Sequence, residues 1–245
     1  MEVLDNDGNV IRTVNHNVES GLNRIYWSLR QKGVRSPNMP KPTKPDAREP
    51  GGPPVLPGDY TVRLTNGKES VSQTVSVLTD PRVGINKRNL ERLQPIYQRQ
   101  MEITTSVTMA MDQIREAKAT IQSINKMLNP KGNKSHKELI SRGKAISDSL
   151  KLLEELIVNK KGLQGIVRSP NILSSKVGAI GRYLYSNLSG PNDSHKYLLD
   201  YAEVETEKVL NQVNMFFKKD WDEYQSEVED ADLSFFKSYK PIKIN

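Results

Sequence analysis

The chain of 245 residues carries a formal net charge of +7 and contains no cysteine. Without cysteine it forms no disulfide, thiolate metal site or thiol nucleophile. None of its apolar runs approaches the ~18 residues of a membrane-spanning helix, and its length predicts one or two domains. No signal peptide is recognisable in this chain, which leaves secretion open because a leader can be removed.

The positive charge is concentrated in the middle of the chain. Residues 81–190 carry 19 basic and 8 acidic side chains, an excess of +11, whereas residues 191–245 carry 7 and 12, an excess of −5. Two such segments would partly neutralise each other if they packed together in one bundle. The alternative is binding to nucleic acid or anionic surfaces. We do not expect it, because no basic loop with interleaved aromatic residues and no recognition motif is present.

The N-terminal part has the alternating pattern of β-strands. Residues 2–4 and 10–14 flank a polar loop that contains Gly8 and predict a hairpin. Residues 21–30 predict a strand with Trp27 at the centre of a small sandwich, although a tryptophan can also form the floor of a sugar site.

A proline-rich stretch, residues 36–57, holds eight of the 14 prolines. Because proline fixes φ and removes a hydrogen-bond donor, this stretch predicts a long surface loop with polyproline character. It is either a tethered loop or a peptide ligand for an aromatic groove. A second hairpin is predicted after it, from residues 58–65 back to Leu78 around an Asn66-Gly67 turn, with inward side chains of Tyr60, Val62 and Leu64.

Three sequence stretches carry a family resemblance: GLNRIYWSLR at residues 21–30, PPVLPGDYTVRL at 53–64 and TVSVLTDPRV at 74–83. They resemble the C-terminal region of bacterial proteins with a BNR-repeat, sortilin-like β-propeller, often labelled glycosyl hydrolases. Ser28 stands where the family motif has aspartate. The resemblance implies an Ig-like module, similar to that of flagellar hook-capping proteins, followed by helices and located in the periplasm or outside the cell. It also implies a propeller upstream, in a larger protein within which this chain begins.

From Asn86 onward the apolar period changes from two to 3.6 residues. Pro95 is expected either to kink a short first helix, capped by Asn86 or Asn89, or to start the main helix. That helix is predicted over residues 96–128, and its apolar stripe comprises Ile96, Ile103, Val107, Ala110, Ile114, Ala117, Ile121, Ile124 and Leu128.

Three further helices are predicted over about 135–157, 174–188 and 194–228, and together with the main helix they would form an antiparallel four-helix bundle. Ser135 and Glu138 match a capping box at the start of the second helix. Gly143 lies on the apolar stripe of that helix and would permit close approach of a neighbour. The fold class is therefore a β + α chain: an Ig-like sandwich over 1–84, incomplete at its N-terminus, a bundle over 85–232 and an aromatic tail over 233–245.

No motif for catalysis, cofactor binding or metal binding is present. His16, His136 and His195 share no ligand spacing and are expected to be exposed residues of turns or first helical turns. The carboxylates between Asp220 and Asp232 predict a solvated acidic face rather than the acid/base pair of a glycosidase. The candidates for contacts between the two parts, or with a partner, are Trp27, Arg30, Asp80, Arg82, Phe235, Phe236 and Tyr239.

The leading functional hypothesis is a noncatalytic accessory region that positions, caps or assembles a propeller. The chain alone is not expected to be an enzyme, whereas its parent protein could be a glycosyl hydrolase to whose substrate site this region contributes. A basic bundle that binds nucleic acid or anionic surfaces is the third hypothesis. The expected partner is the upstream propeller of the same polypeptide. A homo-oligomer and a glycan or protein ligand stay open, as does the place where the aromatic tail docks.

Overall fold

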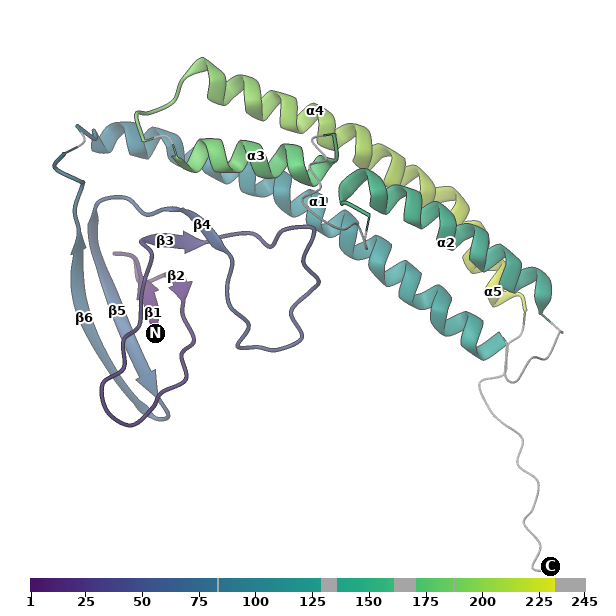
Figure 1. Ribbon diagram of the computed structural model, residues 1–245, viewed down its shortest axis with the longest axis horizontal. Helices are drawn as coiled ribbons and strands as arrows, with labels where there is room; N and C mark the ends of the chain where they lie inside the picture. The colour runs from purple at the N-terminus through teal and green to yellow at the C-terminus, as the bar shows by residue number, and fades with distance from the viewer. Residues whose placement is uncertain (83, 129–135, 161–170, 187, 232–245) are drawn as a thin grey trace, which may run out of the picture.

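The computed structural model describes residues 1–82, 84–128, 136–160, 171–186 and 188–231. A small antiparallel β region is followed by helices that pack into an elongated rod, and the β region lies beside the N-terminal half of the longest helix, α1 (Lys87–Leu128) (Figure 1). The expected order of a β region followed by four main helices is confirmed.

Four strands form the main sheet, β1 (Glu2–Leu4), β2 (Val10–Thr13), β5 (Gly58–Asn66) and β6 (Glu69–Val77), in the order β2-β1-β5-β6. All three neighbouring pairs are antiparallel. The first predicted hairpin is confirmed. Its loop is closed by the Asp5 carboxylate, whose Oδ1 accepts hydrogen bonds from the backbone nitrogens of Asp7 at 3.0 Å and Asn9 at 2.8 Å.

The second hairpin is confirmed, but its turn is one residue later than expected. Asn66 pairs with Glu69, so the turn residues are Gly67, at φ 61°, and Lys68. Leu64 was expected to point inward, yet it is 42% exposed. The pairing of β1 with β5 reaches only to Arg63, and the outer part of the hairpin is exposed, so no layer covers Leu64.

The predicted strand over residues 21–30 is wrong. Only β3 (Arg30–Lys32) pairs, and its partner β4 (Gly51–Pro54) lies inside the stretch predicted to be loop. Leu29, at φ 56°, interrupts the extended backbone before β3. β3 and β4 approach each other so closely that a Cβ on Gly52 would lie 2.5 Å from the Lys32 carbonyl oxygen, which only glycine avoids.

The long helix α1 has 42 residues and runs without a break through Pro95. The expectations of a separate short helix and of a start at Pro95 are therefore wrong. Asn86 precedes the helix, and its side-chain oxygen accepts a hydrogen bond from the Arg88 nitrogen at 2.9 Å. Leu93 and Tyr97, on either side of Pro95, are buried, and this packing offsets the hydrogen bond that proline cannot make. The predicted apolar stripe is buried except for Ile96, which is half-buried.

The remaining helices are α2 (Lys137–Ile157), α3 (Leu173–Ser186), α4 (Asp193–Phe216), a π-helical turn η1 (Phe217–Trp221) and α5 (Asp222–Glu229). The predicted helix 194–228 is thus confirmed as α4, η1 and α5 in succession. The predicted capping box involves Ser135, which lies outside the described residues; the N-cap of α2 is His136, whose side chain makes no capping hydrogen bond.

The expected four-helix cross-section is wrong, because α2 and α3 lie end to end between α1 and α4 (Figure 1). Both run antiparallel to α1: Gly143 and then Glu154 of α2 lie against Asn125 and then Lys118. Gly181 and then Tyr185 of α3 lie against Gln100 and then Tyr97. The rod is therefore three helices thick along its length. The predicted close approach at Gly143 is confirmed, since a Cβ there would lie 2.9 Å from the hydroxyl oxygen of Tyr224.

Candidate functional site

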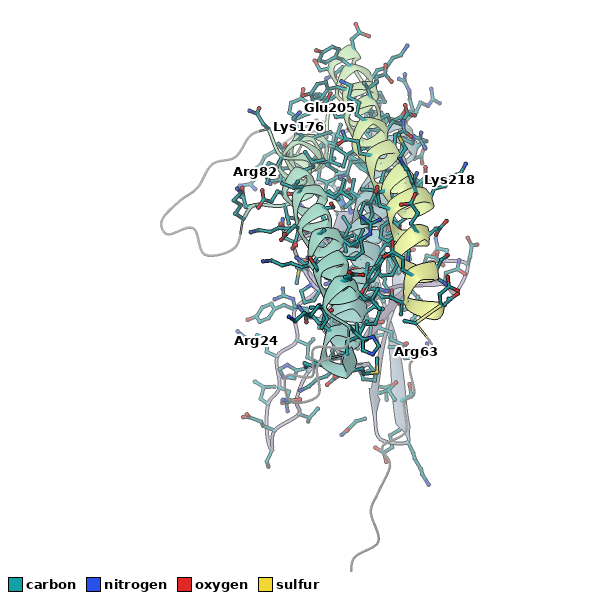
Figure 2. The ribbon with its side chains drawn as sticks, turned by 90° about the vertical axis from the view of Figure 1, so that its right-hand side faces the viewer. Arg24, Arg63, Arg82, Lys176, Glu205 and Lys218 are labelled. Atoms are coloured by element: carbon teal, nitrogen blue, oxygen red, sulfur yellow. The ribbon has the colours of Figure 1, made fainter. Side chains whose placement is uncertain are left out.

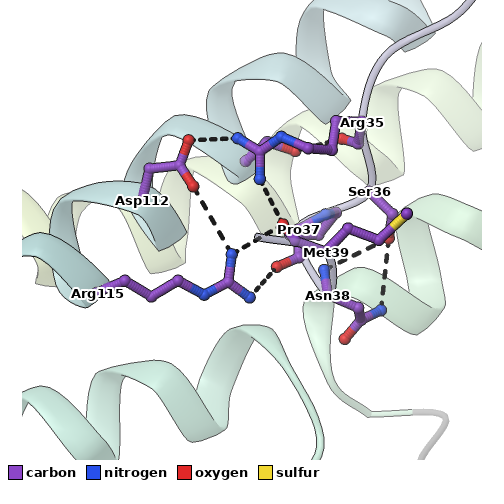
Figure 3. A network of polar contacts seen from close by, with 8 residues as sticks. Arg35, Ser36, Pro37, Asn38, Met39, Asp112 and Arg115 are labelled. Atoms are coloured by element: carbon purple, nitrogen blue, oxygen red, sulfur yellow. Dashed lines mark hydrogen bonds and ion pairs between the residues drawn. The ribbon is translucent and has the colours of Figure 1, made fainter. Parts of the chain in front are cut away.

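A cluster of polar side chains, three of them on α1, joins this helix to the beginning of the proline-rich stretch (Figure 3). Arg35 forms an ion pair with Asp112, whose other carboxylate oxygen lies 3.6 Å from Arg115. Arg115 donates hydrogen bonds to the carbonyl oxygens of Met39 at 3.0 Å and Pro37 at 2.7 Å. We call this set of side chains, with Thr108, the clamp. The Thr108 hydroxyl donates to the Arg35 carbonyl at 2.8 Å.

The clamp is largely shielded from water. The side chains of Arg35 and Asp112 are only 17% and 11% exposed, so their attraction is screened less than that of a surface ion pair. The carbonyl oxygens that accept hydrogen bonds from the clamp, those of Arg35, Pro37 and Met39, belong to no strand, and the clamp supplies donors for them. The prediction of a tethered loop is therefore confirmed, and its anchor is the middle of α1.

A second contact between the regions is apolar. A pocket of about 200 Å³ lies where Leu29, Val55 and Leu78 of the β region face Leu90 and Tyr97 of α1. Its lining is mostly hydrocarbon, with Thr79, Asp80 and Gln94 among its polar members. The pocket therefore has the properties of a packing contact between the two regions.

Behind this pocket, an aromatic pair connects α1 with α3. Tyr97 and Tyr185 meet edge to face with ring centroids 5.2 Å apart, and the Tyr185 hydroxyl donates to Gln100 Oε1 at 2.7 Å. Burial raises the pKa of Tyr185 to about 12. The phenol therefore stays protonated in neutral solution and acts as a hydrogen-bond donor that aligns the two helices.

Of the residues predicted to make contacts between the regions, Trp27 and Arg30 lie mainly within the β region. Trp27 is half-buried, its Nε1 donates to the Arg30 carbonyl at 3.1 Å, and its ring meets Tyr60 edge to face at 5.5 Å. Arg30 donates to the Gly52 carbonyl at 3.0 Å, which holds β3 to β4. The expected burial of Trp27 at the centre of a sandwich is thus corrected to a partly exposed aromatic pair.

Asp80 and Arg82 were expected to form ion pairs across the junction, but they pair with each other, with Arg82 Nη2 2.6 Å from Asp80 Oδ2. The Arg82 side chain is 86% exposed, although Asp80 does line the apolar pocket. The ion pair between the regions is formed instead by Arg35 and Asp112, which lie far apart in the sequence and carry no motif that could have identified them. Phe235, Phe236 and Tyr239 lie outside the described residues.

The basic and acidic segments of the chain pair in space as the charge distribution predicted. Arg99 pairs with Glu203, and Arg142 with Glu223 at 3.3 Å. Lys176 pairs with Glu205 at 2.5 Å, and both are labelled in Figure 2. Hydrogen bonds from Lys176 and Lys208 lower the pKa of Glu205 to about 2. Within the described residues, three basic side chains of the middle segment therefore pair with carboxylates of the C-terminal segment.

The acidic cluster near the C-terminal end of the rod takes part in helix contacts. Glu223 and Glu227 both lie within ion-pair distance of Arg142 on α2, at 3.3 and 3.4 Å. Glu229 accepts a hydrogen bond from Gln225 at 2.7 Å. Within the described residues, no three histidine, aspartate or glutamate side chains gather in a way that could hold a metal ion.

The three histidines differ in environment. His16 is exposed and His136 is half-buried, whereas His195 is completely buried, so its expected exposure is wrong. His195 completes a reciprocal capping box: its nitrogen donates to Asn192 Oδ1 at 3.0 Å, and its Nδ1 accepts from the Asn192 nitrogen at 3.0 Å. The spacing of an N-cap asparagine and a side-chain acceptor three residues later could have revealed this.

Comparisons with known proteins identify no relative: no family model, curated protein or solved structure matches this chain. Among the described residues, no helix combines the length and hydrophobicity needed to span a bilayer.

Proposed function

We propose that this chain is a noncatalytic accessory region of an exported bacterial β-propeller protein. In this proposal an Ig-like β module and a helical rod position or cap the propeller, or mediate its assembly. The clamp supports this proposal, because a loop anchored to α1 by Arg35, Asp112 and Arg115 holds the β region at a fixed place on the rod. A fixed angle between two rigid parts is the property that a spacer or cap requires.

Two further features support this proposal. Two chemistry-bearing side chains are used in packing and capping: Tyr185 aligns two helices, and His195 closes a helix N-terminus. The resemblance of residues 21–30, 53–64 and 74–83 to the region that follows a BNR-repeat propeller supplies the expected partner. The four-stranded sheet and the β3–β4 pair would correspond to the two layers of an Ig-like module.

The first experiment is to determine the reading frame upstream of Met1 and to express any propeller encoded there. We expect propeller repeats, and we expect the isolated propeller to bind this chain in isothermal titration calorimetry. Asp112→Ala should weaken binding, because it frees the proline-rich loop from α1. The matched control is Asp148→Ala, which removes an exposed aspartate from α2. An upstream frame without propeller repeats, or a propeller that does not bind, would refute the proposal.

A second experiment separates this proposal from a role in glycan processing. The chain, alone and joined to its propeller, is incubated with a panel of oligosaccharides. The accessory role predicts no turnover that depends on residues of this chain. Turnover abolished by Glu116→Gln or Asp222→Asn, two carboxylates that line an open groove of the rod, would defeat the accessory role.

A further inference from the structure

One groove of the rod takes no part in the contacts described above. It has a volume of about 600 Å³ and is lined only by residues of α1, α4, η1 and α5. The half-buried rings of Phe217 and Trp221 form its apolar wall, with centroids 6.0 Å apart. Both rings belong to the π-helical turn, a feature that occurs frequently at functional sites.

The charged side chains that line the groove, which we call its rim, are two acidic and one basic. The carboxylates of Glu116 on α1 and Asp222 on α5 line it, against the single ammonium group of Lys218. A segment that combines aromatic side chains with several lysines would therefore match both the wall and the rim of the groove.

The chain itself contains such a segment, residues 232–245, which lie outside the described residues. Its sequence places Phe235, Phe236 and Tyr239 among the lysines 237, 240 and 243. The composition of the segment thus matches the groove. Its aromatic residues suit the rings of Phe217 and Trp221, and its lysines suit the carboxylates of the rim.

The distance to the groove is short enough for this segment. Described residues end at Ala231, close after α5, and the groove begins at Gln225 and extends back to Asn214. This part of the rod is about 17 Å long, at about 1.5 Å per helical residue. Residues 232–245 can span up to about 45 Å when extended, at about 3.3 Å per residue, so the segment can reverse direction and run along the whole groove.

We propose that residues 232–245 fold back and bind in this groove of the same chain. The rings of Phe235, Phe236 and Tyr239 cover Phe217 and Trp221, and the three lysines lie near Glu116 and Asp222. The bound segment adds a fourth length of polypeptide beside the three helices that form the rod. This inference does not depend on the proposed accessory function.

The test uses the fluorescence of Trp221 in the full chain. Trp27→Phe leaves Trp221 as the sole tryptophan and keeps an aromatic ring against Tyr60. In this background, Phe235→Ala/Phe236→Ala/Tyr239→Ala is expected to shift the Trp221 emission to the red and to increase its quenching by acrylamide. Tyr197→Ala, which removes a 70% exposed ring from α4, is the matched control and should change neither. Circular dichroism verifies that each variant keeps its helix content.

Reversing the lysines, with Lys237→Glu/Lys240→Glu/Lys243→Glu, should cause a smaller change in the same direction, which added salt reproduces in the parent protein. Emission and quenching that are identical in the parent and the triple-alanine variant would overturn the proposal. Emission that depends on protein concentration, with dimers in sedimentation velocity, would place the segment of a second copy in the groove and would also overturn binding within one chain.

Discussion

The β region and the rod are stabilised by different interactions. The rod has a continuous apolar core that extends from Leu90 to Tyr224, whereas the buried apolar side chains of the β region are Val3, Leu4 and Val55. The β region is instead held by polar contacts around Arg12, which is only 7% exposed. We infer that the rod can fold by itself, while the β region depends on its attachment to α1.

The largest expected effect tests the core of the rod. Leu150 of α2 is completely buried, and Leu150→Ala should lower the free energy of unfolding by about 2 to 5 kcal/mol, because it leaves a cavity. Leu152→Ala, two residues away and 66% exposed, is the matched control and should have little effect. Urea denaturation followed by circular dichroism measures both. Equal losses in the two variants would contradict the placement of α2 against the core.

The next prediction tests the polar support of the β region. Arg12 donates to the carbonyl oxygens of Pro50 and, at 2.9 Å, of Glu49. Arg12→Met should remove about 1 to 3 kcal/mol of local stability, since it leaves two acceptors without their donor. Hydrogen exchange should accelerate in β1, β2 and β5 and stay unchanged in α2. Arg24→Met, at an exposed arginine, serves as the control. Equal acceleration in the rod would mean that the two regions unfold together.

A smaller effect is expected at the closest helix contact. Gly143→Ala places a Cβ 2.9 Å from the hydroxyl oxygen of Tyr224, and this overpacking should outweigh the gain in helix propensity, with a net loss of about 1 to 2 kcal/mol. Combination with Tyr224→Phe, which removes that oxygen, should restore most of the loss. Gly178→Ala is the control, because its Cβ would have its nearest neighbour at 3.6 Å and should be neutral or stabilising. Thermal denaturation of the parent protein, the two single variants Gly143→Ala and Tyr224→Phe, and the double variant gives the coupling.

The smallest effect concerns pH. Burial lowers the pKa of His195 from its ordinary value of 6.5, so the unfolded chain binds this proton more readily than the folded chain. The contribution of neutral His195 to stability is therefore complete above pH 6.5 and decreases as the pH falls toward the folded-state pKa. His195→Gln, which keeps a capping-box acceptor, should flatten the change in urea midpoint between pH 7.5 and 5. An unchanged slope would exclude His195 as its source.

The periodicity of the sequence predicted the elements of the rod well, because each stripe must be buried by a neighbouring helix. It could not predict that Pro95 lies inside α1, since the packing of Leu93 and Tyr97 overrides the local preference of proline. It also could not predict that α2 and α3 lie end to end along α1. The apolar stripe of each helix is equally compatible with two helices packed side by side. The expected tight approach at Gly143 was correct, since the absence of a side chain is itself a packing signal.

The candidate contact residues were predicted less well. Hydrophobic and proline-rich patterns show that a segment is irregular, but not which surface it binds. The pairing of Arg35 with Asp112 depends on the path of the whole β region, and nothing near either residue marks it.

The β region is attached to α1 at two levels, near Tyr97 through the apolar pocket and near Asp112 through the clamp. These levels are about 22 Å apart, at about 1.5 Å per helical residue. A domain attached to a helix at one point can rotate about that point, whereas attachment at two separated points opposes this rotation. A force applied to the exposed tip of the β5–β6 hairpin would therefore be transmitted to α1 and bend this helix. It would not rotate the β region about the segment that connects β6 to α1.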